Sequence, residues 1–182
     1  MAKAIKLTTL ILGIIFTALL VAYLCAPHGV LLDFTITAGV FFYHFFMRLV
    51  VGLGINAICK NKIDYTKAWF KEKNWEKRFF DFIKIKKWKK HIPTYAPETF
   101  DPKTHTLTEI ASATCQAEII HEVIMVLSLL PILLCIPFNA IAVFIITSIM
   151  AALIDSVFVL LQRYNRPRLM KVIERSQKKS SK

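Results

Sequence analysis

The chain has 182 residues, 55% of them hydrophobic, and a formal net charge of +12. Its cations are confined to blocks, since residues 117–162 contain no Lys or Arg whereas residues 60–90 contain twelve and residues 163–182 contain eight. This separation of apolar from basic segments is typical of membrane-spanning proteins. It argues against nucleic acid as a partner, because apolar flanks hold the basic run against a bilayer.

Four apolar stretches follow in chain order, at residues 7–24, 34–58, 117–136 and 138–161. Each is long enough to cross about 30 Å of hydrocarbon as a helix. We therefore predict an all-α integral membrane protein with four transmembrane helices in two hairpins and a cytoplasmic amphipathic helix between them. The predicted segments are a first hairpin (1–58), a basic segment (59–116), a second hairpin (117–162) that turns at Pro137 and Asn139, and a basic tail (163–182).

The basic segments fix the expected orientation. The N-terminus, the central segment and the tail are all basic, whereas residues 25–33 and 131–139 contain no cation. Four spans place the three basic regions on one side, which the positive-inside rule makes the cytoplasm. The first stretch lacks an A-x-A cleavage site, so we interpret it as an anchor and not a signal peptide. Cys25 and Cys135 then share the outer face and could pair, although free thiols are the simpler interpretation.

The sequence predicts an amphipathic helix over residues 66–83, lying in the headgroup layer. Aromatic residues share one arc of it and charged residues the opposite arc, but Glu72 and Glu76 fall on the aromatic arc. Either both carboxylates reach water at the helix edge, or one enters a polar site beneath the helix, for which Glu76 is the better candidate. The Lys- and Trp-rich run that follows is expected to attract lipid headgroups.

Six ionisable side chains lie in the predicted spans, where charge is costly and a functional role is the default hypothesis. They are His44, Arg48, Glu118, His121, Glu122 and Asp155. The i, i+3, i+4 spacing of the three on the third span gives them one helix face. Asp155 is expected at a similar depth on the fourth span, so the two helices should bring three carboxylates and an imidazole together, with Arg48 as the counter-ion of this cluster.

Three interpretations of this cluster remain open. His121 could be a general base oriented by Glu118, Glu122 or Asp155, since imidazole titrates near neutral pH and a carboxylate partner fixes its tautomer. The cluster could instead be purely structural, a set of polar contacts that joins the four helices. A metal site is the weakest interpretation, because the second Glu-x-x-His and the two further Glu of di-iron bundles are missing.

The eight residues from Gln162 to Leu169 read QRYNRPRL. Together with Trp75-Glu76, with Trp88-Lys89 before Pro93, and with Glu118 followed by His121, this string resembles the glycosyl-4,4'-diaponeurosporenoate acyltransferase family of small bacterial membrane proteins. The resemblance extends from about residue 70 to residue 169. It implies transfer of a fatty acyl group to a sugar hydroxyl of a glycosylated carotenoid at the bacterial cell membrane. The string contributes Gln162, Arg163, Tyr164, Asn165, Arg166 and Arg168 to the implied site, and the departures from the family pattern are Gln116, Glu122 and Asp155.

The function we predict is a lipid-active acyltransferase with His121 as base and no bound cofactor or metal. Its donor is expected to be acyl-coenzyme A or a similar acyl donor, and its acceptor a lipid or glycolipid at the cytoplasmic leaflet. The predicted substrate-binding residues are His44, Arg48, Trp75, Glu76, Trp88, Lys89 and the string residues. The arginines of the string suit phosphates, because guanidinium binds them bidentately, or else they are an ordinary stop signal. The alternatives are a non-catalytic lipid-binding or assembly protein and a different transferase on isoprenoid or glycolipid substrates.

The distribution of cations predicts that both termini and residues 60–107 are cytoplasmic. A Cys introduced at Lys103 should therefore stay unlabelled by an impermeant thiol reagent in intact cells and react after permeabilisation. Labelling of that Cys from outside would contradict the predicted topology.

Overall fold

The computed structural model describes residues 2–92, 97–138 and 140–180. Every element in these residues is helical, and four helical segments are long and apolar enough to cross a membrane, as predicted: Ala2–Cys25, Gly29–Cys59, Leu107–Phe138 and Ile141–Lys179. Two of the residues used above, Pro93 and Asn139, lie outside the described residues. The chain divides into two compact units, and each is described by itself. One comprises Ala2–Leu53 and Glu122–Ser156, and the other Gly54–His121 and Val157–Lys182.

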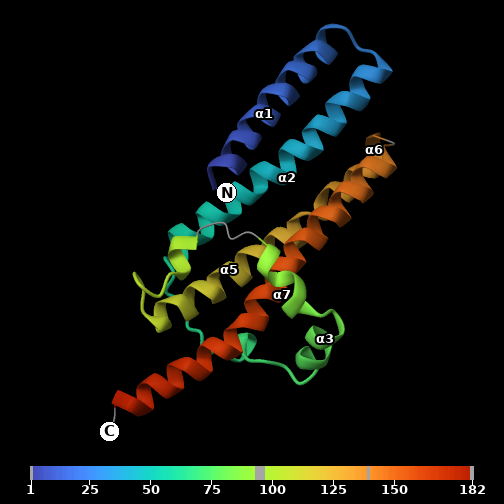
Figure 1. The fold of residues 1–182 in the computed structure, drawn as a ribbon. Coiled ribbons are helices and arrows are strands. Elements are labelled where there is room, and N and C mark those ends of the chain that lie inside the picture. Colours follow the sequence, from blue (N-terminus) through green and yellow to red (C-terminus); the bar gives the residue numbers. More distant parts are fainter. Residues whose placement is uncertain (1, 93–96, 139, 181–182) are drawn as a thin grey trace. The chain divides into compact units, whose positions relative to one another are not determined.

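The first hairpin consists of α1 (Ala2–Cys25) and the longer α2 (Gly29–Cys59), which run side by side (Figure 1). Their backbones approach closely at two glycines. A Cβ on Gly39 would lie 2.8 Å from the ring of Phe16, and one on Gly13 would lie 3.0 Å from the ring of Phe42. These two rings stack at 5.9 Å, so the glycines make room for an aromatic layer between the helices.

The outer surfaces of this hairpin remain apolar. Leu10, Ile14, Leu24 and Phe34 are each more than 60% exposed in the isolated chain. Hydroxyls in these helices bond to the carbonyl four residues back, as Thr17 does to Gly13 at 2.8 Å. A helix pair with apolar faces and with threonine hydroxyls bonded within their own helix is suited to lipid.

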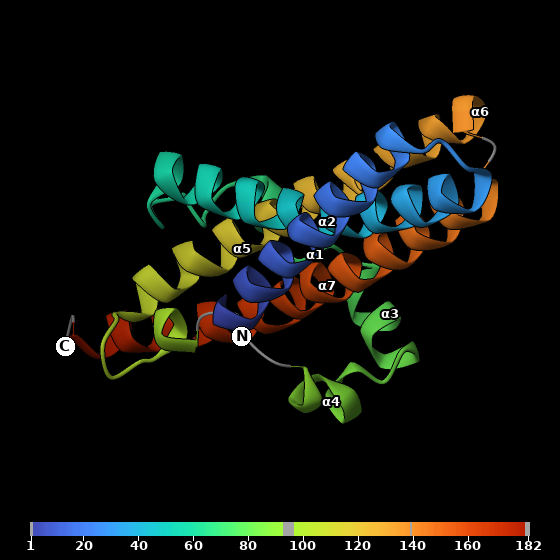
Figure 2. The same cartoon turned by 90° about the horizontal axis from the view of Figure 1, so that it is seen from above.

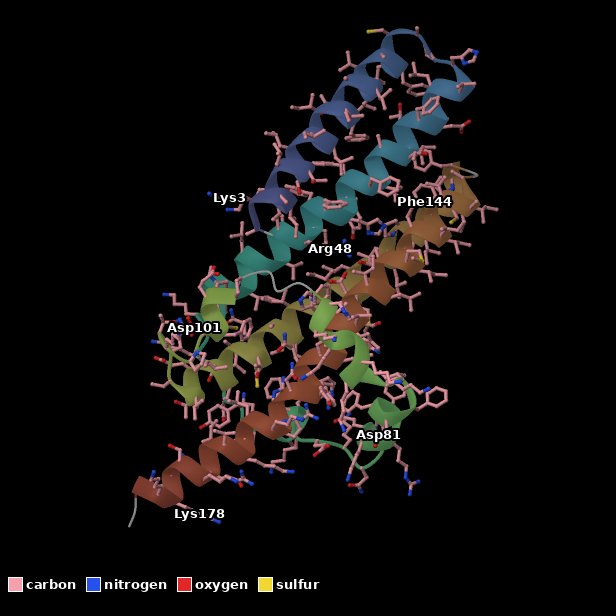
Figure 3. All side chains as sticks on the ribbon, in the orientation of Figure 1. Lys3, Arg48, Asp81, Asp101, Phe144 and Lys178 are labelled. Atoms are coloured by element: carbon pink, nitrogen blue, oxygen red, sulfur yellow. The ribbon has the colours of Figure 1, made fainter. Side chains whose placement is uncertain are left out.

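The segment between the hairpins differs from the predicted helix over residues 66–83. It folds instead into the 3₁₀ turn η1 (Ala68–Phe70), the seven-residue helix α3 (Glu76–Phe82) and the short helix α4 (Ile85–Trp88), followed by η2 (Lys89–His91) and η3 (Pro97–Phe100). Figure 2 shows α3 and α4 as two short helices in succession. The continuous helix was a wrong prediction, because the backbone is extended at Lys71 and the buried carboxylate of Glu76 accepts a hydrogen bond from the Lys73 N–H at 3.1 Å. The charged arc is nevertheless exposed, as Asp81 illustrates in Figure 3.

The third span begins ten residues before its predicted start. Helix α5 (Leu107–Leu127) is opened by a capping box, in which Thr106 N–H donates to Glu109 Oε2 at 2.8 Å and the Glu109 N–H donates to Thr106 Oγ1 at 3.3 Å. The span then continues as the 3₁₀ segment η4 (Leu130–Leu134), with Pro131 in its first turn, and as α6 (Cys135–Phe138).

The last helix, α7 (Ile141–Ser180), has 40 residues and includes the basic tail that was predicted as a separate segment. It continues through Pro167, which has no N–H to donate to the carbonyl of Arg163. All four cysteines are free thiols, so Cys25 and Cys135 are not paired in this structure.

Candidate functional site

The centre of the second unit is a carboxylate held by two arginines. Glu118, on α5, has no exposed surface, and its two oxygens accept hydrogen bonds from Arg163 at 2.5 Å and from Arg166. Arg163 and Arg166 lie three residues apart on α7 and so share a helix face. Two of the three arginines in residues 162–169, the string of the sequence analysis, therefore face α5.

A second carboxylate completes this arrangement. Glu76, the first residue of α3, is 1% exposed, and its Oε1 accepts from Arg163 Nε at 2.5 Å. Two guanidinium groups thus face two carboxylates, and the four formal charges sum to zero. The hypothesis that Glu76 enters a polar site beneath the segment is confirmed, whereas Glu72 is exposed.

Backbone carbonyls take up the remaining donors of Arg166. This side chain is 2% exposed, and it donates to the carbonyls of Phe70 at 3.2 Å and Thr114 at 3.4 Å while its guanidinium lies over the Phe70 ring at 5.0 Å. Neither Phe70 nor Thr114 was predicted. Thr114 could have been found, because it precedes Glu118 by one helical turn and so shares its face.

The proposed base His121 follows Glu118 by one helical turn on α5. Its half-buried imidazole stacks on Phe158 of α7 with ring centroids 4.7 Å apart and planes within 13°. This stack fixes the plane of the ring and leaves the two ring nitrogens at its edges.

The first unit contains a separate ion pair between predicted residues. Arg48 of α2, labelled in Figure 3, binds Asp155 of α7 and also donates to the carbonyls of His44 at 2.7 Å and Ala151 at 3.4 Å. Arg48 is therefore the counter-ion of one of the predicted carboxylates, Asp155, whereas the counter-ions of Glu118 are Arg163 and Arg166. His44 is 4% exposed, and neither ring nitrogen has a hydrogen-bond partner among the described residues. Glu122 is half-buried and belongs to this unit.

Two departures from the family pattern thus have polar partners. Gln116 is 3% exposed, donates to Asn56 Oδ1 at 3.1 Å and accepts from the Asn61 N–H at 2.7 Å. Asn61 and its neighbour Lys60 have positive φ, so Gln116 stabilises the tight turn that ends α2. Asp155 has Arg48 as its partner. Within the described part of the chain, no three His, Cys, Asp or Glu side chains are grouped to hold a metal ion.

The remaining predicted residues lie around α3, α4 and the tail. Tyr164 is 8% exposed and packs in a small core with Phe80, Ile85 and Leu161. Trp88 is half-buried and donates from Nε1 to the carbonyl of Ile83 at 2.9 Å, whereas Trp75 is 56% exposed and contacts Phe79 edge-on. Gln162 is half-buried, and Lys89, Asn165 and Arg168 gather around Tyr164.

These features define a helical membrane protein whose polar centre is a buried arginine–glutamate network built from α3, α5 and α7. The sequence model of the glycosyl-4,4'-diaponeurosporenoate acyltransferase family matches residues 66–175, which include every residue of this network. The chain belongs to that family. No curated protein and no solved structure matches it.

The network predicts a large effect of removing its central charge. Glu118→Gln leaves two buried guanidinium groups with one carboxylate, so the free energy of unfolding should fall by about 3–5 kcal/mol. A thermal-shift assay in detergent should show a lower melting temperature, whereas Glu72→Gln, which changes an exposed carboxylate, should leave it unchanged.

The double variant Glu118→Gln/Arg166→Gln removes one charge of each sign and should recover part of the lost stability. Equal melting temperatures for wild type and Glu118→Gln would contradict the energetic role given to the network.

Proposed function

We propose that the protein transfers a fatty acyl group from an acyl donor such as acyl-coenzyme A to a hydroxyl of a lipid or glycolipid acceptor of the glycosylated carotenoid type. The observation that supports this proposal is the family match over residues 66–175. The four apolar helices are consistent with an acceptor that resides in a membrane. The distribution of cations favours chemistry at the cytoplasmic leaflet, with both termini in the cytoplasm.

In the proposed mechanism His121 is the general base. It takes the proton of the acceptor hydroxyl as that oxygen attacks the carbonyl carbon of the acyl thioester. The tetrahedral intermediate then expels the thiolate, and the imidazolium returns the proton to the leaving sulfur. The reaction forms one ester bond and breaks one thioester bond, and it needs no oxidant or metal.

The hydrogen bonds of Glu118 favour a positioning role for this residue. Both of its oxygens accept from arginines, so its charge is already balanced within the protein. By holding Arg163 and Arg166 against α5, Glu118 fixes the helix turn that carries His121 and the face of α7 that carries Phe158. Rigid support of this kind is what a catalytic side chain needs.

Replacement of the proposed base tests the mechanism. General-base catalysis contributes typically 10²–10⁴-fold, so His121→Gln should lower acyl transfer by at least about a hundredfold. Transfer is measured with purified protein, a radiolabelled acyl thioester and a glycosylated carotenoid acceptor, with the product separated by thin-layer chromatography. His105→Gln is the matched control, because His105 is an exposed histidine near Glu109, and it should retain activity.

The melting temperature of His121→Gln should stay close to that of the wild type, because Gln keeps hydrogen-bonding capacity and approximate size. Near-normal acyl transfer by the folded variant would exclude His121 as base. Absence of transfer by the wild-type protein with several acyl thioesters, together with specific lipid copurification, would favour the non-catalytic lipid-binding alternative.

A further inference from the structure

Lys89 and Arg168 meet at the ring of Tyr164. The Arg168 guanidinium carbon lies 4.1 Å from the ring centroid and the Lys89 Nζ lies 4.9 Å from it. Arg168 also donates to the Tyr164 hydroxyl, and Lys89 Nζ donates to Asn165 Oδ1 at 3.0 Å. Two side chains 79 positions apart in the sequence thus place two positive charges next to the Tyr164 ring.

The charges of this pair differ from those of the buried network. Arg163 and Arg166 have carboxylate partners, but no described carboxylate forms an ion pair with Lys89 or Arg168. Burial and the nearby charge of Arg168 both lower the pKa of Lys89. The two like charges therefore destabilise each other, and a bound anion would relieve this repulsion.

The cations also keep free donors. A guanidinium group has five N–H donors and an ammonium group three. The hydrogen bonds to Tyr164 and Asn165 use one donor of each, which leaves several N–H groups at the exposed side of the cluster. A fork of guanidinium donors beside an ammonium matches the oxygens of a phosphate group.

The surrounding structure holds the cluster in place. Tyr164 packs against Phe80 edge-on at 5.4 Å within the small core of α3, α4 and α7. The chain enters α4 through Lys84, whose φ of 52° is left-handed, and the Trp88 hydrogen bond to Ile83 closes this turn directly before Lys89. The backbone on both sides of the cluster is thus fixed by packing, which lowers the entropy cost of binding.

We propose that Lys89 and Arg168, held by Tyr164 and Asn165, form a binding site for a phosphate group of the acyl donor. This assignment rests on the proposed function, in which the donor is a phosphorylated thioester such as acyl-coenzyme A. A lipid headgroup carries the same phosphate chemistry, so the two sources are separated by experiment.

The test uses the full chain in nanodiscs of zwitterionic phosphatidylcholine, with coenzyme A as the probe and calorimetry as the readout. Loss of a charge-assisted hydrogen bond weakens binding by roughly tenfold or more, so Lys89→Gln and Arg168→Lys should each raise the Kd by at least that factor. The matched controls are Lys87→Gln in α4 and Arg175→Lys in α7, which change exposed cations close in the sequence to Lys89 and Arg168. Their Kd should stay within about twofold of wild type, as expected for exposed charges.

A second arm replaces part of the phosphatidylcholine with phosphatidylglycerol and measures the anionic lipid retained by the protein with native mass spectrometry. Weaker coenzyme A binding in Lys89→Gln and Arg168→Lys, with unchanged lipid retention, supports the proposal. Loss of lipid retention alone overturns the donor assignment in favour of a headgroup site. Unchanged behaviour in both arms, with melting temperatures like that of wild type, overturns the site itself.

These binding assays need no turnover, so they separate this proposal from the proposed function. A protein that binds coenzyme A through Lys89 and Arg168 but transfers no acyl group would refute the reaction and leave the phosphate site standing.

Discussion

The bond between Glu118 and its two arginines is the constraint on which the second unit depends. Glu118 and Arg166 are buried, Arg163 is 10% exposed in its side chain, and Glu76 adds α3 to these charges from α5 and α7. Burying each ion costs several kcal/mol, so a well-packed apolar set could join these helices equally well. What the network adds is a constraint on how these helices are oriented. Arg163 bonds to both α3 and α5, and Arg166 bonds to α5, so the positions of these guanidinium groups restrict how α7 packs against the two helices.

The two faces of the family string follow from helix geometry. At 100° per residue, Arg163 and Arg166 fall on one side of α7, and Tyr164 and Arg168 fall on the other. One face reaches Glu118 and Glu76, and the other reaches Lys89. A stop signal would need only charge, whereas this string needs particular residues at particular angles. The aromatic ring and the amide beside Lys89 would have no purpose in a stop signal.

Sequence reasoning predicted the long elements well and the short ones poorly. Four apolar stretches are a strong signal because a bilayer demands length, and Arg48 was predicted as a counter-ion because a charge in a span is costly. The helix over residues 66–83 failed although its periodicity was real, because the backbone is extended at Lys71 and the carboxylate of Glu76 is also held by Arg163, 87 positions later. No pattern within a window of eighteen residues contains that partner.

The same limit explains how the arginines of the tail were interpreted. Three arginines in six residues looked alike in the sequence, and they suited either phosphate or a stop signal. Their partners distinguish them, since Arg163 and Arg166 form ion pairs with carboxylates, whereas Arg168 has no carboxylate partner among the residues that the structure describes. A cation whose charge is already balanced gains little from a phosphate, because binding would first have to displace the carboxylate. Arg168 lies against Tyr164 and near the charge of Lys89, and within the described part of the chain it has no carboxylate for a phosphate to displace. Among the arginines of the string, the capacity to bind an added anion therefore lies with Arg168, and Lys89 is the partner that sequence spacing could not have supplied.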